Sequence, residues 1–254
     1  PSHDGDVTGV LAAVQVLTRV PIRLRAAPEV SRAAPWFPVV GLLIGAVVGG
    51  IAAGMLELVP AAVAATVAVL AGTALTGAFH EDGLADTMDA MGGWTPERRR
   101  EILRDSRHGS YGVAAMCGTI VLRIVCIASL SPAVAFAGCV SAHGLGRAGA
   151  VGVMATAPPM SAEGLGADYA RAIRRPAAAL GIAAAVIASI GVVGWWAAPL
   201  VVAVAVVALI MTTIARRAFG GINGDVLGAV EQLGECAVLV VISGLALRHP
   251  LWWS

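Results

Sequence analysis

Several apolar runs, each about as long as a membrane-spanning helix, restrict what this chain can fold into. A helix needs roughly 20 mostly apolar residues to cross the hydrocarbon core of a bilayer. Runs of this kind occupy residues 39–59, 60–79, 113–131, 133–157, 177–197, 198–215 and 226–247. The sequence therefore predicts an all-α, polytopic membrane protein with about seven spans (six to eight), built as a single integral membrane domain over residues 1–254.

The segments that join the apolar runs differ in charge, and this difference predicts an orientation. All 17 basic side chains are arginines, and most lie before the first run or after the second, fourth and sixth runs. The turns on the opposite side, near Pro60, Pro132 and Pro199, are short and almost uncharged. The positive-inside rule therefore places the N-terminus and the arginine-rich segments in the cytoplasm. Residues 7–22 form a shorter apolar stretch, interpreted as an interfacial helix that ends at Pro21.

The remaining composition excludes several other kinds of protein. Charged residues make up 13% of the chain, about half of the roughly 25% found in soluble domains. The 4 cysteines lie inside apolar runs and form no C-x-x-C pair, so neither a disulfide framework nor a zinc site is expected. The formal net charge of +1 gives no information about nucleic acid, but no RNA- or DNA-binding motif is present, so no nucleic-acid partner is expected. The lipid bilayer of the cytoplasmic (inner) membrane is the expected surrounding.

A cluster of carboxylates follows the second apolar run, in the stretch FHEDGLADTMDAMGG at residues 79–93. On a helix, Asp82, Asp86 and Asp89 share one face within an arc of about 60°. Their mutual repulsion calls for a positive partner, and Mg²⁺ prefers carboxylate oxygens and commonly bridges to phosphates. A solvated acidic first turn is the simpler alternative. Gly83 is expected to allow a turn or a close approach to a ligand.

A second polar cluster occupies residues 95–112 of the same predicted cytoplasmic segment. Thr95 is a plausible N-cap for a short helix that runs to about Asp105. Arg104 and Arg107 then precede a Gly-Ser-Tyr-Gly turn, and arginine side chains suit phosphate oxygens. This segment therefore predicts a cytoplasmic helical loop that contacts phosphate.

Acidic residues also mark the last apolar run and the glycine-rich segment before it. Asp225 lies in that glycine-rich segment, and Glu231 and Glu235 share one face of the run. Acids inside a span are functional by default, so they could complete a metal site, position a hydroxyl nucleophile or form a proton or ion path. Arg147 is a natural partner for one of them, as an ion pair or as a phosphate contact. All three clusters face the same predicted side, which favours phosphoryl-type transfer.

Three motifs closely resemble the cobalamin synthase family, the adenosylcobinamide-GDP ribazoletransferases: FHEDGLADTMDA, EILRDSRHGSYG and FGGINGDVLGAVEQLGE. Weaker similarities follow the same order along the chain: LTRVPI, FPVVGLLIGA and EGLGADY. Two positions depart from the family pattern, since an apolar residue is common at Glu81 and Thr is common at Asn223. Glu81 is therefore not expected to be catalytic.

The resemblance implies a reaction and its requirements. The family joins adenosylcobinamide-GDP to α-ribazole or α-ribazole 5′-phosphate, which gives adenosylcobalamin or its 5′-phosphate and releases GMP. This is the last stage of cobalamin nucleotide-loop assembly, and it uses Mg²⁺ at the cytoplasmic membrane. A homo-oligomer and a complex with other nucleotide-loop enzymes are both compatible with this interpretation.

The expected roles are assigned by motif position. The expected catalytic residues are His80, Asp82, Asp86, Asp89, Asp105 and Asp225, of which Asp82, Asp86, Asp89 and Asp225 hold Mg²⁺. The expected substrate-binding residues are Arg104, Arg107, Gly109, Gly112, Arg147, Gly221, Gly224, Glu231 and Glu235. His80 or one of the carboxylates would take the proton of the nucleophile if a base is needed.

Two other classes of protein are alternatives. One is another membrane phosphotransferase of the CDP-alcohol type, whose D-G-x-x-A-R signature the stretch DGLAD only partly resembles. The other is an ion-coupled transporter in which Glu231, Glu235 and Arg147 form a relay. Transporter sites usually lie at the membrane midplane on broken helices. The acids here concentrate in segments on one side, which argues against transport.

Overall fold

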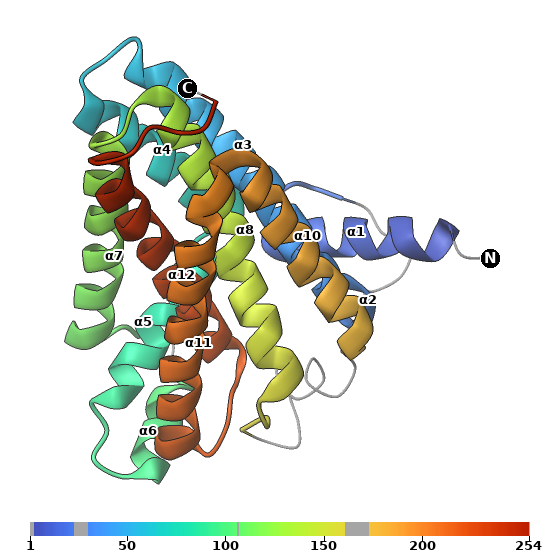
Figure 1. The fold of residues 1–254 in the computed structure, drawn as a ribbon. Helices are drawn as coiled ribbons and strands as arrows, with labels where there is room; N and C mark the ends of the chain where they lie inside the picture. Colours follow the sequence, from blue (N-terminus) through green and yellow to red (C-terminus); the bar gives the residue numbers. More distant parts are fainter. Residues whose placement is uncertain (1–2, 23–29, 106, 161–172, 254) are drawn as a thin grey trace.

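The computed structural model describes residues 3–22, 30–105, 107–160 and 173–253, and within them the chain is almost entirely helical (Figure 1). The elements are α1 (His3–Leu17), α2 (Val30–Ala33), η1 (Ala34–Trp36), α3 (Phe37–Leu56), α4 (Ala61–Thr76), α5 (Phe79–Met91), α6 (Pro96–Ile102), α7 (Ser110–Ala128), α8 (Pro132–Thr156), α10 (Arg175–Val193), η2 (Gly194–Trp196), α11 (Ala197–Phe219) and α12 (Gly224–Ala246). The EGLGADY motif lies outside the described residues. A single bridge between Pro159 and Ile222 is the one β-type pairing in the described part.

Each predicted span coincides with a helix, which confirms a polytopic helical membrane protein. By length and composition, four segments of the described residues could cross a membrane: Ser31–Leu56, Ser110–Ala128, Arg175–Phe219 and Gly224–Ala246. The count becomes five if α4 and α5 form one broken span. The chain reverses direction between α10 and α11, so the longest segment contains two helices (Figure 1). Helix α8 is long enough to span but buries the polar side chains of His143 and Arg147.

Among the described residues, helices α3 and α8 make the most extensive helix–helix contact, through a stripe of small residues. Gly41, Gly45 and Gly49 recur every fourth residue on α3 and therefore share one face. A Cβ at any of these positions would overlap the α8 backbone at His143, Cys139 or Phe136. This contact fixes α8 at the centre, where it also packs against α10, α11 and α12.

A sharp break separates α4 from α5, which the predicted run at residues 60–79 did not anticipate. Gly77 and Ala78 both adopt left-handed backbone conformations, with φ of 68° and 57°. The two helices consequently meet at 88°. The break turns α5 across the end of the bundle, where α6 and the first turns of α7 and α12 also lie (Figure 1).

Replacing Ala78 with Gly is expected to stabilise the protein by about 1 kcal/mol, because Gly lacks the steric penalty that an L-residue has at positive φ. The control is Ala74→Gly, at an exposed position inside α4, which should destabilise by about 1 kcal/mol. Thermal unfolding of the purified protein in detergent measures both. Equal destabilisation by the two substitutions would contradict a strained Ala78.

Helix α1 ends earlier than predicted and lies across its neighbours (Figure 1). The predicted helix at residues 7–22 was to end at Pro21, whereas α1 ends at Leu17. The next residues bond elsewhere, since the backbone N–H of Arg19 donates to the carbonyl of Leu75 on α4 at 2.8 Å. This tertiary hydrogen bond ends the helix before the proline does.

Candidate active site

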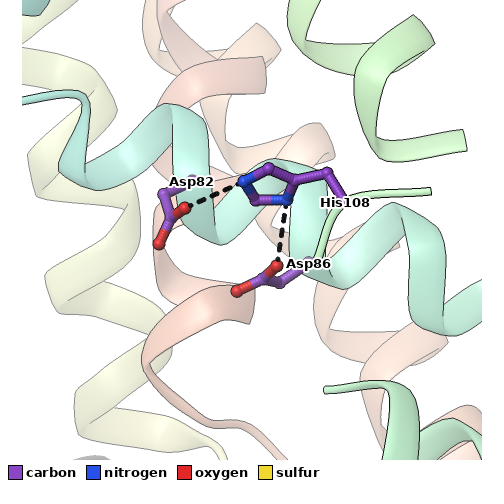
Figure 2. Close-up of side chains that lie close together, drawn as sticks. All are labelled: Asp82, Asp86 and His108. Atoms are coloured by element: carbon purple, nitrogen blue, oxygen red, sulfur yellow. Dashed lines mark ion pairs between the residues drawn. The ribbon is translucent and has the colours of Figure 1, made fainter. Parts of the chain in front are cut away.

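Two carboxylates of α5 and one imidazole meet at the end of the bundle (Figure 2). Asp82 and Asp86 are one helical turn apart, and His108 lies between them, in the segment that leads into α7. Its Nε2 is 3.3 Å from Asp82 Oδ1, and its Nδ1 is 3.4 Å from Asp86 Oδ1. The side chain of Asp82 is 62% exposed and that of Asp86 is 18% exposed. The group is therefore open to water on the Asp82 side.

The third carboxylate of this face, Asp89, holds the beginning of α7. Its two oxygens accept hydrogen bonds from the backbone N–H groups of Gly109 (2.6 Å) and Gly112 (2.8 Å). A carboxylate at a helix N-terminus satisfies donors that have no partner within the helix. The predicted common face is confirmed, because all three carboxylates point toward residues 108–112. Asp89 contacts backbone there, whereas Asp82 and Asp86 contact an imidazole.

Replacing Gly112 with Ala is expected to separate Asp89 from α7. A Cβ at this position would overlap the Asp89 carboxylate and lie 2.7 Å from the carbonyl oxygen of Ala85, so backbone must move. Gly118→Ala is the matched control, because nothing lies within 4 Å of its Cβ position on the same helix. The expected result is a lower melting temperature for Gly112→Ala and an unchanged or higher one for Gly118→Ala. Equal melting temperatures would contradict this contact.

Asp225 comes to the same site from the first turn of α12. The side chain of Asn223 caps this helix by accepting from the N–H of Val226 at 3.0 Å, and it also donates to Asp225 Oδ2 at 2.7 Å. Gly83 lies directly against the backbone of Asp225. Gly83 is therefore not a turn but the point where α5 and α12 touch, which brings Asp225 into electrostatic interaction with Asp82.

The glycines that were predicted to let substrate approach the backbone mostly make contacts within the protein. Gly109 and Gly112 lie against Asp89. Gly221 lies against the backbone of Pro159, next to the bridge that joins the end of α8 to the segment before α12. Gly224 is exposed with open space beside it, so it alone of the four is free for an approaching ligand among the described residues.

Asp105 and Arg107 pair with each other in the turn before the site. Arg107 Nη2 donates to Asp105 Oδ2 at 2.7 Å, and its Nε and backbone N–H donate to the other oxygen. These bonds lower the pKa of the Asp105 carboxyl to about 2. Asp105, for which a catalytic role was predicted, is thus paired with Arg107 in this structure. Arg104 is exposed nearby, and the Arg107 side chain is 85% exposed.

A buried network of ionic side chains lies behind α5 and joins four helices. Arg123 of α7 donates to Glu81 of α5 at 3.1 Å and to Glu235 of α12 at 3.2 Å. Arg147 of α8 lies 2.6 Å from Glu231 and 3.0 Å from Glu235. All five side chains are at most 6% exposed. The network therefore fixes α5 against the core through Glu81, which points away from the face that carries Asp82 and Asp86.

Four of the predicted site residues lie in or beside this network. Arg147 forms the ion pair that was the alternative to a phosphate contact, and Glu231 and Glu235 face that pair instead of an open surface. His80 is also buried, with its Nδ1 3.6 Å from Glu231 Oε2. These side chains are buried because α5, α8 and α12 direct them into the interior of the bundle.

Three residues of the two clusters were absent from the predicted site. His108 was noted in its motif but given no role. Arg123 carries a signal in the sequence, since a charge inside an apolar run is rarely without function. His143 contacts Glu235 in the network, and a lone histidine in an apolar run gives little indication of such a partner.

The donor atoms at the site fit a hard divalent cation. Asp82, Asp86 and His108 each offer one ligand atom, and these atoms lie within 4.8 Å of one another. Carboxylate oxygens suit Mg²⁺, whereas an imidazole nitrogen is a poorer ligand for it. Asp225 lies outside this group of atoms, so Asp82 and Asp86 are the two carboxylates that the structure brings together beside His108, and an imidazole is also suited to proton transfer.

Comparison with known proteins gives one consistent result. The family model described as cobalamin-5-phosphate synthase matches residues 9–243. A protein of Azorhizobium caulinodans named adenosylcobinamide-GDP ribazoletransferase is 36% identical over 97% of this chain and 99% of its own length. Proteins with the same name from Ralstonia nicotianae and Chlorobaculum tepidum are 37% and 33% identical, over 91% and 97% of this chain and 92% and 98% of their own lengths. No solved structure matches the chain.

Proposed function

This chain belongs to the cobalamin-5-phosphate synthase family, and from that membership we propose that it is an adenosylcobinamide-GDP ribazoletransferase. The proposed active site is the cluster of Asp82, Asp86 and His108, whose side chains meet at one end of the bundle. This cluster is the main structural support for the proposal. These residues come from two of the three motifs on which the family resemblance rests. The enzyme acts in the assembly of the cobalamin nucleotide loop.

The reaction joins the cobinamide phosphate of adenosylcobinamide-GDP to α-ribazole or its 5′-phosphate. A hydroxyl oxygen of the acceptor attacks the phosphorus on the cobinamide side of the diphosphate, and the bond from that phosphorus to the bridging oxygen breaks. GMP leaves with the bridging oxygen. The hydroxyl proton passes to a base, and His108 is the imidazole placed beside the carboxylates.

Magnesium would be held by Asp82 and Asp86 with Asp225, and it would neutralise charge on the diphosphate as GMP leaves. Other residues of the chain position these groups. Asp89 fixes the segment that carries His108, and the buried network fixes α5. Arg104 and Arg107, both exposed at the same end, are available to phosphate oxygens. The arginine-rich end faces the cytoplasm under the positive-inside rule, so both soluble substrates reach the site from that side.

The function is tested by supplying the purified protein with either of two donors. Adenosylcobinamide-GDP with α-ribazole or its 5′-phosphate is expected to give GMP and a joined corrinoid product, and removing Mg²⁺ with a chelator should abolish both. A CDP-linked alcohol donor with the same acceptors should give no CMP. Release of CMP without GMP would instead support a CDP-alcohol phosphotransferase. Uptake of cobinamide into vesicles without chemical conversion would support the transporter.

A further inference from the structure

A second cavity lies away from the carboxylates, among α8, α10 and α11, which lie side by side (Figure 1). Its volume is about 450 Å³, within the range of roughly 300–1,000 Å³ that is typical of ligand pockets. Small side chains create it, since Ala148, Gly149 and Gly152 face Ala205 and Ala208 across the gap. None of these residues belongs to the carboxylate site or to the buried network.

The walls and the end of the cavity differ in polarity. Most lining side chains are aliphatic, including Ile182 and Val186 of α10. The end toward the C-terminus of α11 carries Thr156, Thr212 and Arg216. Thr212 and Arg216 are one helical turn apart and share a face. Helix α11 contacts α6, and α6 also contacts α5, which carries the carboxylates. The polar end of the cavity is therefore at the same end of the bundle as the carboxylate site.

We propose that this cavity binds one acyl chain of an anionic phospholipid, whose phosphate contacts Arg216. An aliphatic wall matches a hydrocarbon chain, and burying each CH₂ group contributes about 0.8 kcal/mol. Arg216 is exposed and forms no ion pair with an acidic residue in the described part of the chain, so it remains available to an anion. Basic pockets between helices on the cytoplasmic side recognise anionic head groups in this way.

The experiment measures which lipid the purified protein retains. Native mass spectrometry is performed in detergent with equal amounts of phosphatidylglycerol and phosphatidylcholine of identical chains. The wild-type protein is expected to retain one phosphatidylglycerol in preference. Arg216→Gln should lower that preference about fivefold, which corresponds to about 1 kcal/mol per arginine. The control is Arg217→Gln, since Arg217 is exposed on the same turn but does not line the cavity.

A second pair of variants tests the chain-binding part. Gly152→Leu places a side chain in the cavity from a position where the added Cβ meets only Ile182 Cδ1, at 3.9 Å, and it should reduce retention of both lipids. The control Gly191→Leu lies in open space on α10 and should retain lipid as the wild type does. The proposal is overturned if Arg217→Gln lowers the preference as much as Arg216→Gln does. It is also overturned if Gly152→Leu retains both lipids unchanged.

Discussion

Replacing Asp82 with Asn is expected to lower the rate of GMP release by a factor of about 10² to 10³. The substitution keeps the size of the side chain but removes one of two carboxylates that lie beside the same imidazole. A bound metal supplies several kcal/mol of charge stabilisation in the transition state, and about 3–4 kcal/mol corresponds to this loss of rate. The measurement is steady-state GMP release in detergent at increasing Mg²⁺ concentrations.

The dependence on Mg²⁺ separates a metal ligand from a structural residue. Asp82→Asn should need more Mg²⁺ for half-maximal rate, and its melting temperature should stay close to that of the wild type because the side chain is 62% exposed. Glu97→Gln is the matched control, since Glu97 is an exposed acid in the first turn of α6 at the same end of the bundle. Near-normal turnover of Asp82→Asn with unchanged Mg²⁺ dependence would refute the metal assignment.

Replacing Arg123 with Met is expected to destabilise the protein by about 3–5 kcal/mol, the usual cost of removing one partner of a buried ion pair. Glu81 would lose its only guanidinium partner among the described residues, whereas Glu235 would keep its contacts with Arg147 and His143. A loss of this size approaches the whole stability of many domains, about 5–15 kcal/mol. The measurement is thermal unfolding and the yield of monodisperse protein in detergent.

A double variant distinguishes loss of the ion pair from loss of packing. Arg123→Met with Glu81→Leu removes the charge that the single variant leaves unpaired, so it should recover part of the lost stability. Arg98→Met is the surface control, because the Arg98–Glu101 pair is 64% exposed on both sides and should contribute less than about 1 kcal/mol. If Arg123→Met is no more harmful than Arg98→Met, the buried network does not hold α5 in place.

The helical spans, the N-cap at Thr95 and the common face of Asp82, Asp86 and Asp89 could be predicted because they depend on local periodicity and capping. Thr95 accepts from the N–H of Arg98, as its position before Pro96 indicates. A helix face needs only the number of residues per turn. The sequence was therefore sufficient wherever the interacting residues are close along the chain.

The partners of buried groups could not be predicted in this way, since they are set by tertiary packing. Asp89 bonds to Gly112, 23 residues later, and Arg123 bonds to Glu235, 112 residues later. Local periodicity places these residues on a face but does not say which helix that face meets. The break at Ala78 was missed because alanine favours a continuous helix, whereas Ala78 adopts a left-handed conformation here.

The break between α4 and α5 also determines how deep the carboxylates lie. Helix α4 has 16 residues, and at 1.5 Å per residue it rises only about 24 Å, less than the roughly 30 Å of a typical hydrocarbon core. A span shorter than the hydrocarbon core is accommodated by local thinning of the bilayer, by snorkelling of flanking residues or by oligomerisation, and we consider the effect of thinning around α4. The diphosphate would then meet Asp82 and Asp86 in a depression below the surrounding head groups. The turnover rate should therefore depend on the thickness of the membrane, and so on the acyl-chain length of the host lipid.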